Sequence, residues 1–329
     1  MRPRVRLDDL PEAALDLELS SWLGRRSYRA DDFPLERLVA CKRSTVSVVL
    51  PARNVAGTIA SIVDTLVPLR ERGLVDELVV IDAASADGTA HIAARHGATV
   101  HQESELLPEF GPARGKGDAM WRGLHATTGD VVVYLDTDTE DFADRLLLGL
   151  LGPVLSELEV QLVKGSFRRP LRVGDALIPD GGGRVTELLA RPFLNLYVPE
   201  LAGFRQPLAG EIAARRDFLE SISFPVGYGI EIAMLIDALD LLGLDALAQV
   251  DLETRQNRHQ PLPNLSAMAY GVLTAAARRV HDTSALKTFG AGTIALPMPD
   301  GLELRRVPVE ERPPLRSLRR ASRRRSGAR

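Results

Sequence analysis

The feature that most constrains this chain is a regular alternation of short apolar runs and longer amphipathic stretches, which begins at Thr45. The apolar, β-branched runs predict β-strands over residues 46–50, 77–81, 131–135 and 160–163. The stretches between them have helical spacing of apolar residues and cover residues 58–70, 88–96 and 117–126. Because strands and crossover helices alternate, we expect an α/β fold with a mostly parallel sheet covered by helices on both faces.

The rest of the chain divides around this pattern. Apolar and acidic residues at helical spacing predict a helical N-terminal extension over residues 1–44. The α/β half then covers residues 45–180, and a more helical half covers residues 181–300, with helices expected over residues 185–194, 231–242 and 265–279. Residues 301–329 end in an arginine-rich stretch, and we expect a flexible basic tail to which we assign no function.

Composition excludes several classes of protein. With 41 Lys+Arg against 44 Asp+Glu the net charge is −3, which gives no reason to expect a nucleic-acid partner. Cys41 is the only cysteine, so an intrachain disulfide and a multi-cysteine zinc site are excluded and a reducing compartment fits best. No apolar run approaches the roughly 18 residues of a membrane helix, and the first residues lack the apolar core of a signal peptide. We therefore expect a cytoplasmic protein without a membrane partner.

The loops after the predicted strands should carry the ligand site, because parallel sheets bind ligands at the carboxyl ends of their strands. The first such loop, Pro51-Ala52-Arg53-Asn54-Val55-Ala56-Gly57, lacks the G-x-G-x-x-G pattern and disfavours a dehydrogenase. The segment 111–117 resembles a phosphate loop only superficially, since Phe110 replaces the first glycine and Gly117 replaces the Ser or Thr. A P-loop kinase is therefore disfavoured as well.

The most informative unit is Asp136-Thr137-Asp138, which directly follows the apolar run 131–135. Alternate strand residues share a face, so the two carboxylates can bind one hard divalent cation, which in turn binds a diphosphate. Acidic residues after a strand also cap the following helix, and the triplet alone does not decide between these readings.

Four further blocks decide the reading. They are Gly115-Lys116-Gly117, Gln161-Leu162-Val163-Lys164, Gly181-Gly182-Gly183-Arg184-Val185-Thr186-Glu187-Leu188 and Gly227-Tyr228-Gly229-Ile230-Glu231-Ile232. With the Asp-x-Asp triplet, they resemble the retaining GT-A glycosyltransferases of the glucosyl-3-phosphoglycerate synthase and mannosyl-3-phosphoglycerate synthase family, over about residues 45–263. The resemblance implies a GT-A fold, a homodimer, and transfer of a hexose from a nucleoside-diphosphate sugar to 3-phosphoglycerate in compatible-solute synthesis.

The same resemblance assigns the donor side. It implies Lys116, Asp136 and Glu231 as catalytic residues and Asp138 as a ligand of Mg²⁺ or Mn²⁺. Lys116 lies between two glycines before a helix, where its ammonium would offset leaving-group charge. The implied donor-binding residues are Pro51, Ala52, Arg53, Val55, Asp82, Ala83, Lys116, Asp136, Thr137, Leu208, Gly210, Tyr228 and Glu231.

The glycine-rich block 181–183 leads into a predicted helix and suits anion capture, because free backbone N–H groups and the helix dipole favour an anion there. Arg184 can bind a carboxylate or phosphate through paired hydrogen bonds, and the Thr186 hydroxyl can add another. The resemblance implies an acceptor site made by Gly183, Arg184, Val185, Thr186 and Asn257.

Two departures from the family pattern bear on specificity. The family keeps a metal-binding histidine in a His-Arg-Asn order, whereas this chain has the reverse order, Asn257-Arg258-His259. In an alignment without gaps Asn257 occupies the position of the family's metal-binding histidine, but we assign the metal to His259. The first loop has Arg53 and Val55, and Ala83 stands where the glucosyl enzymes place a serine against uracil. We therefore expect mixed donor use with GDP-mannose ahead of UDP-glucose or GDP-glucose, and strict use of UDP-glucose is the alternative.

The reaction itself has one open point. No carboxylate is an evident nucleophile, although Glu211 lies in a segment that the family places beneath the sugar. A front-face reaction, in which the leaving phosphate accepts the proton, is the simpler hypothesis. Two alternatives remain: a glycosyltransferase acting on a polyisoprenyl phosphate, and an inactive sugar-nucleotide or polyanion-binding module that uses the arginine tail.

Overall fold

A computed structural model describes residues 12–169, 171–173, 176–178, 182–255, 261–280, 292–298 and 301–319. Its centre is an eight-stranded sheet in the order β1-β11-β6-β9-β5-β2-β3-β4. The strands in chain order are β1 (Ser27–Arg29), β2 (Val46–Ala52), β3 (Glu77–Asp82), β4 (Thr99–Gln102), β5 (Val131–Tyr134), β6 (Leu162–Arg168), β9 (Ile212–Arg215) and β11 (Leu247–Thr254). Only β9 runs antiparallel to its neighbours among these strands, so the expected mostly parallel sheet is confirmed.

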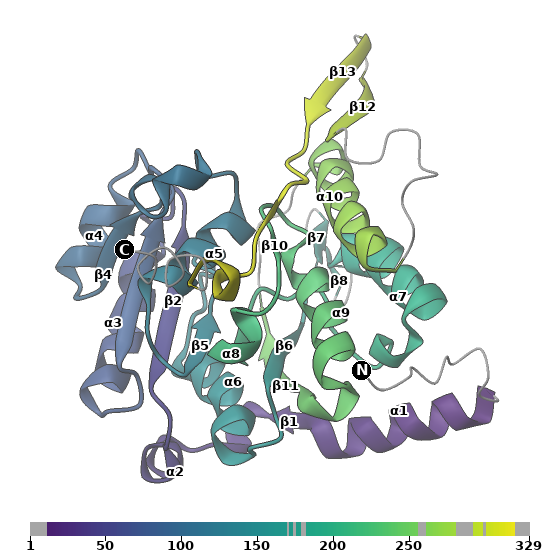
Figure 1. Ribbon diagram of the computed structural model, residues 1–329. Helices are drawn as coiled ribbons and strands as arrows, with labels where there is room; N and C mark the ends of the chain where they lie inside the picture. Colours follow the sequence, from purple (N-terminus) through teal and green to yellow (C-terminus); the bar gives the residue numbers. More distant parts are fainter. Residues whose placement is uncertain are drawn as a thin grey trace, which may run out of the picture.

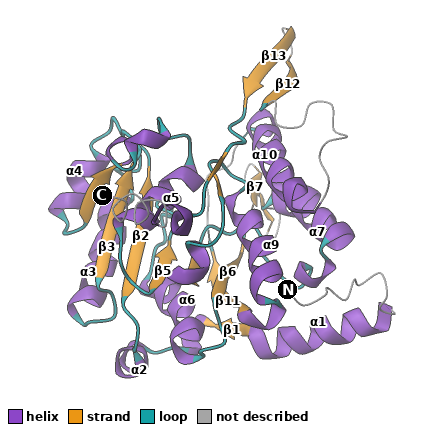
Figure 2. Ribbon diagram, in the orientation of Figure 1, coloured by secondary structure: helices purple, strands orange, loops and turns teal. Residues whose placement is uncertain are grey.

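Helices cover both faces of this sheet, as Figure 2 shows. One face packs against α3 (Ile59–Glu71), α4 (Thr89–Arg95), α6 (Asp144–Ser156) and α2 (Leu35–Cys41). The other face packs against α5 (Lys116–Ala126), α9 (Ile230–Leu242) and α7 (Arg191–Tyr197). Neighbouring strand residues alternate between the two cores: Val49 contributes to the second and Leu50 to the first. This period-two alternation of buried residues explains why the strands read as continuous apolar runs.

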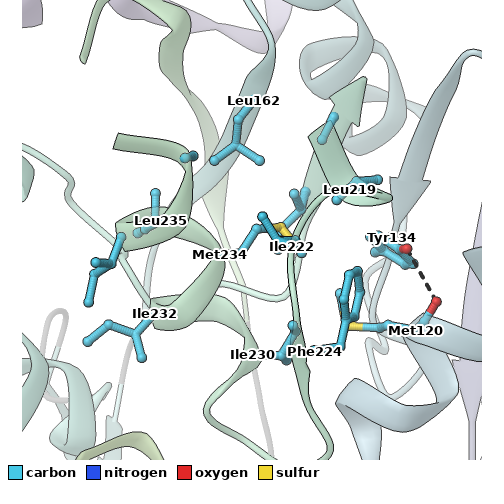
Figure 3. Close-up of a cluster of buried hydrophobic side chains, with 14 of the residues drawn as sticks. Met120, Tyr134, Leu162, Leu219, Ile222, Phe224, Ile230, Ile232, Met234 and Leu235 are labelled. Carbon is cyan, nitrogen blue, oxygen red and sulfur yellow. Dashed lines mark hydrogen bonds between the residues drawn. The ribbon is translucent and has the colours of Figure 1, made fainter. Parts of the chain in front are cut away.

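A buried cluster fixes α5 and α9 relative to the sheet (Figure 3). Ile230, Ile232, Met234 and Leu235 come from α9, and the Tyr134 hydroxyl donates a hydrogen bond to the Met120 carbonyl at 3.3 Å. Full burial of each apolar side chain contributes about 1.5–3 kcal/mol. The cluster therefore holds the first turns of both helices at the carboxyl edge of the sheet.

The two expected halves share this one sheet, since β9 and β11 come from residues beyond 181. The N-terminal extension contains the expected helix, α1 (Glu12–Arg26), but it also supplies the edge strand β1, which the sequence pattern did not indicate. The Trp22 indole N–H donates to the Leu247 carbonyl at 3.0 Å and ties this extension to β11. The remaining α-helices are α8 (Arg216–Leu219) and α10 (Leu262–Val280).

The chain end departs from expectation. β12 (Thr293–Met298) and β13 (Gly301–Arg306) form a hairpin, and β14 (Glu311–Arg312) pairs with β10 (Phe224–Pro225). Residues 315–319 are helical and Leu315 is buried. The expectation of a flexible tail from residue 301 is therefore wrong for residues 301–319, because apolar side chains between the arginines anchor this segment; residues 320–329 lie outside the described part.

Short elements complete the described chain. A small antiparallel pair is formed by β7 (Leu171–Val173) and β8 (Ala176–Ile178). The short helical turns are η2 (Ala30–Asp32), η3 (Glu103–Glu105), η4 (Pro108–Phe110), η5 (Thr186–Ala190), η6 (Pro199–Leu201) and η7 (Leu244–Ala246). Within the ranges that the structure describes, no helix has both the length and the apolar character needed to cross a bilayer.

A pair of helical glycines tests the packing of α6. A Cβ at Gly152 would lie 2.1 Å from the Phe33 ring, whereas a Cβ at Gly24 in α1 meets nothing within 4 Å. We expect Gly152→Ala to lower the free energy of unfolding by about 1–3 kcal/mol, because the ring must move. Gly24→Ala should leave it unchanged or raise it by up to about 1 kcal/mol through helix propensity. Denaturant titration measures both, and equal effects would contradict this packing.

Candidate active site

The predicted donor loops converge at the carboxyl edge of the sheet. Ala52 and Asp82 are register partners at the ends of β2 and β3, and the Ala83 N–H donates to the Ala52 carbonyl at 2.9 Å. The Thr137 hydroxyl donates to the Pro51 carbonyl at 2.7 Å, which joins the Asp-x-Asp segment to the first loop. Segments far apart in the sequence therefore form one continuous rim, as expected for a parallel sheet.

Within this rim, Asp82 is the candidate residue for reading the base. It is 1% exposed, and its Oδ2 accepts a hydrogen bond from the Ser85 N–H at 3.1 Å. Its Oδ1 is buried and has no hydrogen-bond partner among the described residues. The Val55 N–H is occupied by the Thr89 hydroxyl at 2.9 Å, and Arg53 is exposed. A buried acceptor without a partner suits a ligand N–H group.

The three predicted catalytic residues meet in one charge cluster. Lys116, the first residue of α5, places its Nζ 2.5 Å from Asp136 Oδ1 and 2.8 Å from Glu231 Oε1. Asp136 follows β5, and Glu231 lies in the first turn of α9. The Glu231 side chain is only 5% exposed. The three groups are thus held by three different elements of the fold.

Burial and charge act in opposite directions on this cluster. Burial disfavours the charged form of Lys116, but the carboxylates of Asp136 and Glu231 outweigh it and hold the pKa of Lys116 above its usual value. Burial likewise opposes ionisation of Asp136, yet Lys116 and Arg255 keep the pKa of Asp136 well below its usual range. Lys116 and Asp136 therefore both stay ionised at neutral pH.

The backbone at Gly210 lies directly against this cluster. A Cβ built there would be 2.2 Å from Lys116 Nζ and 2.4 Å from Asp136 Oδ1. Leu208, two residues earlier, is half-buried, and Tyr228 before α9 is 50% exposed. A side chain at position 210 would therefore displace the charged ends of Lys116 and Asp136.

Arg255 is a site residue that the sequence analysis did not assign. It follows β11, is buried, and its guanidinium lies 3.4 Å from Asp136 Oδ2 and 3.1 Å from Asp138 Oδ1. It also forms an ion pair with buried Glu211. An arginine after a strand run has no distinguishing pattern, so only the fold reveals that it bridges the two aspartates.

Lys164 is a second unassigned group. It lies on β6, is 1% exposed, and donates a hydrogen bond to the Ala209 carbonyl. Burial is the largest influence and lowers its pKa to about 7. The available signal was a lysine inside an otherwise apolar strand, which indicates a buried cation with a specific partner.

The described part of the predicted acceptor loop leads into a helix, and one of its glycine N–H groups is already hydrogen-bonded within the protein. The Gly182 N–H donates to the Arg169 carbonyl at 2.9 Å, and Gly183 has a φ of +73°, which favours glycine. Helix begins at Arg184, with a π-helical segment at Thr186–Ala190, and Thr186 is buried. Val185 is buried as well.

A cavity of about 390 Å³ adjoins this loop, with lining residues Ser166, Phe167, Arg168, Arg169, Gly182, Glu187, Arg191, Arg205, Gln206 and Asp251. Its four arginines outnumber its two carboxylates. The cavity therefore suits an anionic ligand.

The metal assignment is described only in part. The Asp138 side chain is 56% exposed at the mouth of the site and offers hard carboxylate oxygens, the ligands that Mg²⁺ and Mn²⁺ prefer. In the described ranges no group of three His, Cys, Asp or Glu side chains is placed to hold a metal. Asn257 and His259 both lie outside the described residues, so the choice between them stays a prediction.

Comparison with known proteins gives the class first. A family model described as Glycosyl transferase family 2 matches residues 47–170. Together with the mostly parallel sheet and the Asp-x-Asp rim, this defines a glycosyltransferase of the GT-A fold.

Individual relatives then identify the narrower family. A glucosyl-3-phosphoglycerate synthase of Mycolicibacterium smegmatis is 43% identical over 303 residues, 91% of this chain and 98% of that protein. The crystal structure of mannosyl-3-phosphoglycerate synthase from Rubrobacter xylanophilus has a TM-score of 0.81 and 47% identity, covering 91% of this chain and 99% of that one. The glucosyl-3-phosphoglycerate synthase of Mycobacterium tuberculosis, solved with Mn²⁺, UDP-glucose and phosphoglyceric acid, has a TM-score of 0.77 and 41% identity, covering 87% and 95%.

The chain belongs to the glucosyl-3-phosphoglycerate synthase and mannosyl-3-phosphoglycerate synthase family and is a glycosyltransferase. The family, the GT-A fold and the enzyme class expected from the sequence are confirmed. The individual residue roles, the homodimer and the cytoplasmic location stay predictions.

Gly210 provides a test of the charge cluster. We expect Gly210→Ala to reduce kcat for hexosyl transfer by about 100-fold, because the new methyl group separates Lys116 from Asp136 and a displacement of about 1 Å in a site costs rate on this scale. The far-UV circular dichroism spectrum should be unchanged. The matched control is Gly57→Ala, an exposed glycine whose Cβ would meet nothing within 4 Å. Full activity of Gly210→Ala would contradict the described cluster.

Proposed function

We propose that this enzyme transfers a hexose from a nucleoside-diphosphate sugar to 3-phosphoglycerate with retention of anomeric configuration. The observation that carries the proposal is the contact of Lys116 with Asp136 and Glu231 on the same edge of the sheet as the arginine-lined cavity. Arg255 connects the charge cluster with the cavity. Its guanidinium pairs with Asp136 of the cluster and lies 5.4 Å from the centre of the Phe167 ring in the cavity wall.

On the donor side, the Lys116 ammonium is suited to stabilise the negative charge that builds on the departing diphosphate. Asp138, with a ligand from the segment 256–260, would hold a divalent cation, and a structure of a relative contains Mn²⁺. When bound, the cation neutralises diphosphate charge. The Glu231 carboxylate can accept hydrogen bonds from the hydroxyls of the donor sugar.

A front-face displacement and a covalent intermediate both give retention, and the ion pairs of the nearby carboxylates favour the front-face displacement. The buried carboxylates of Glu231 and Glu211 already form ion pairs, Glu231 with Lys116 and Glu211 with Arg255. In a front-face reaction the bond from the anomeric carbon to the diphosphate oxygen breaks, and a bond to the hydroxyl oxygen of 3-phosphoglycerate forms on the same face. The leaving phosphate oxygen takes the hydroxyl proton, so no side-chain base is required.

On the acceptor side, 3-phosphoglycerate offers a phosphate and a carboxylate. Backbone N–H groups at Gly183 and at the helix start beside Val185 suit one anion, and the Arg184 guanidinium with the Thr186 hydroxyl suits the other. Asn257 completes the proposed acceptor set. The excess of arginine in the adjoining cavity favours entry of a molecule with several negative charges.

For the donor we propose mixed use, with GDP-mannose ahead of UDP-glucose. The buried Asp82 Oδ1 can accept an N–H from guanine or from uracil, so it does not by itself exclude either base. The relative solved from R. xylanophilus is named a mannosyl enzyme at 47% identity, which supports the mannosyl activity. Strict use of UDP-glucose is the second candidate, because curated relatives at 43–49% identity are named glucosyl enzymes.

The direct test incubates the purified chain with 3-phosphoglycerate and each of GDP-mannose, GDP-glucose and UDP-glucose, with Mn²⁺, Mg²⁺ or a chelator. We expect a hexosyl-3-phosphoglycerate of the same anomeric configuration as the donor, detected by mass and NMR, and loss of transfer on chelation. Absence of product with every donor would refute the acceptor assignment. An inverted anomer would refute retention, and a marked preference for UDP-glucose would refute the proposed donor order.

Arg184 tests the acceptor side separately. We expect Arg184→Ala to raise the KM for 3-phosphoglycerate by about 10- to 100-fold, because a charge-assisted paired hydrogen bond is lost, and to leave the KM for the donor nearly unchanged. Arg72→Ala, at an exposed ion pair with Glu36 at the end of α3, is the matched control. Steady-state kinetics with each substrate varied in turn give the answer. Wild-type behaviour at low acceptor concentration is the contrary result.

A further inference from the structure

The chain after β13 crosses the molecule as a strap, residues 307–315, which runs from the β12–β13 hairpin to the short helix beside α5 (Figure 1). Its strand β14 pairs with β10, and the Val226 N–H donates to the Glu310 carbonyl at 3.0 Å. β10 leads into the turn before α9, so the strap lies against the segment that delivers Glu231 to the site.

The strap also carries a buried arginine. Arg312 donates to both carboxylate oxygens of Asp118, at 2.9 Å from Nε and 2.5 Å from the guanidinium terminus. It further donates to the carbonyls of Phe110 and Pro112. Asp118 is fully buried and also pairs with Arg122 at 3.1 Å. Removing one partner from such a buried charge network leaves the remaining charge poorly compensated.

These contacts converge on the loop that presents Lys116. Asp118 lies in the first turn of α5, two residues after Lys116, and its N–H donates to the Val226 carbonyl at 3.1 Å. A Cβ at Gly117 would lie 1.9 Å from the Pro225 carbonyl oxygen, so this turn is packed against β10 without free space. On the other side of the loop, Arg114 pairs with Glu310 of the strap at 2.5 Å.

The strap is also linked to α9 through α10. Glu311 accepts a hydrogen bond from Arg279 of α10 at 3.0 Å, and Arg279 binds both oxygens of Asp237 on α9 at 2.8 and 2.9 Å. Adjacent residues of β14 therefore connect directly to α5, which begins with Lys116, and through Arg279 to α9, whose first turn carries Glu231. We propose that the strap is a positioning element of the active site and that Arg312 is its positioning residue, which acts on hexosyl transfer through Lys116.

The proposal rests on the proposed function, because its readout is hexosyl transfer by the wild-type enzyme. The variants are Arg312→Met, Arg312→Lys, Lys116→Met and the double variant Arg312→Met/Lys116→Met. The matched control is Arg316→Met. Arg316 lies in the short helix that follows the strap, is half-exposed, and pairs with Asp217 of α8. All are measured in the full-length chain by steady-state kinetics with each substrate varied in turn, with the fold checked by circular dichroism.

We expect Arg312→Met to lower kcat by about tenfold or more with a smaller change in the donor KM, because Lys116 acts on charge that develops in the transition state. Arg312→Lys should lose less, and Arg316→Met should match the wild type. In Lys116→Met, adding Arg312→Met should cause little further loss, since residues that act through one another are not additive.

Two results would overturn the proposal: folded Arg312→Met with wild-type kcat, or a double variant whose loss equals the product of the two single losses. The second result would show a general structural role for Arg312. If Arg312→Met does not fold, the kcat losses of Arg312→Lys, Lys116→Met and the double variant Arg312→Lys/Lys116→Met are compared in the same way. An inactive wild-type chain would instead refute the proposed function, so the two failures are distinguishable.

Discussion

The ion pair between Lys116 and Asp136 is the interaction on which the site depends. Charges removed from water are stable only when they are paired and hydrogen-bonded, and here Glu231 and Arg255 extend the pair into a network. Each partner comes from a different element: the start of α5, the end of β5, the start of α9 and the end of β11. The backbone at Gly210 lies against the ion pair, so any side chain at this position would displace Lys116 and Asp136. The position of every element at this edge is therefore constrained by the same electrostatic requirement.

The sequence predicted most of the central fold because its signals were local. The runs at 46–50, 77–81 and 131–135 appear as β2, β3 and β5, and the stretches between them appear as α3, α4 and α5. Other strands depended on tertiary contacts. β1 is three residues long and is a strand only because β11 lies beside it. The strap was predicted to be part of a flexible basic tail because an arginine-rich stretch follows it, although buried Arg312 and Leu315 anchor it.

The site was predictable where glycine or charge patterns marked a loop. Lys116, Asp136 and Glu231 were named because the blocks that contain them resemble the family, and their ion pairs bring the three side chains together, while their catalytic roles stay predictions. Arg255 and Lys164 were not assigned a role, since nothing local separates Arg255 from a surface cation and the apolar run before Lys164 indicates burial but no partner. Their function depends on burial beside partners such as Asp138 and the Ala209 carbonyl, which are distant in sequence. Local sequence patterns do not show which buried charges, distant in the sequence, are paired in the fold.

The buried pair between Asp118 and Arg312 joins residues 194 positions apart. Protein synthesis proceeds from the N-terminus, so Asp118 leaves the ribosome long before its bidentate partner. During that interval the first turn of α5 lacks its contacts with β14, and Asp118 lacks the Arg312 guanidinium. The first turn of α5 therefore reaches its described contacts only after residue 312 has been synthesised, and a chain that terminates before this residue lacks the guanidinium that binds Asp118.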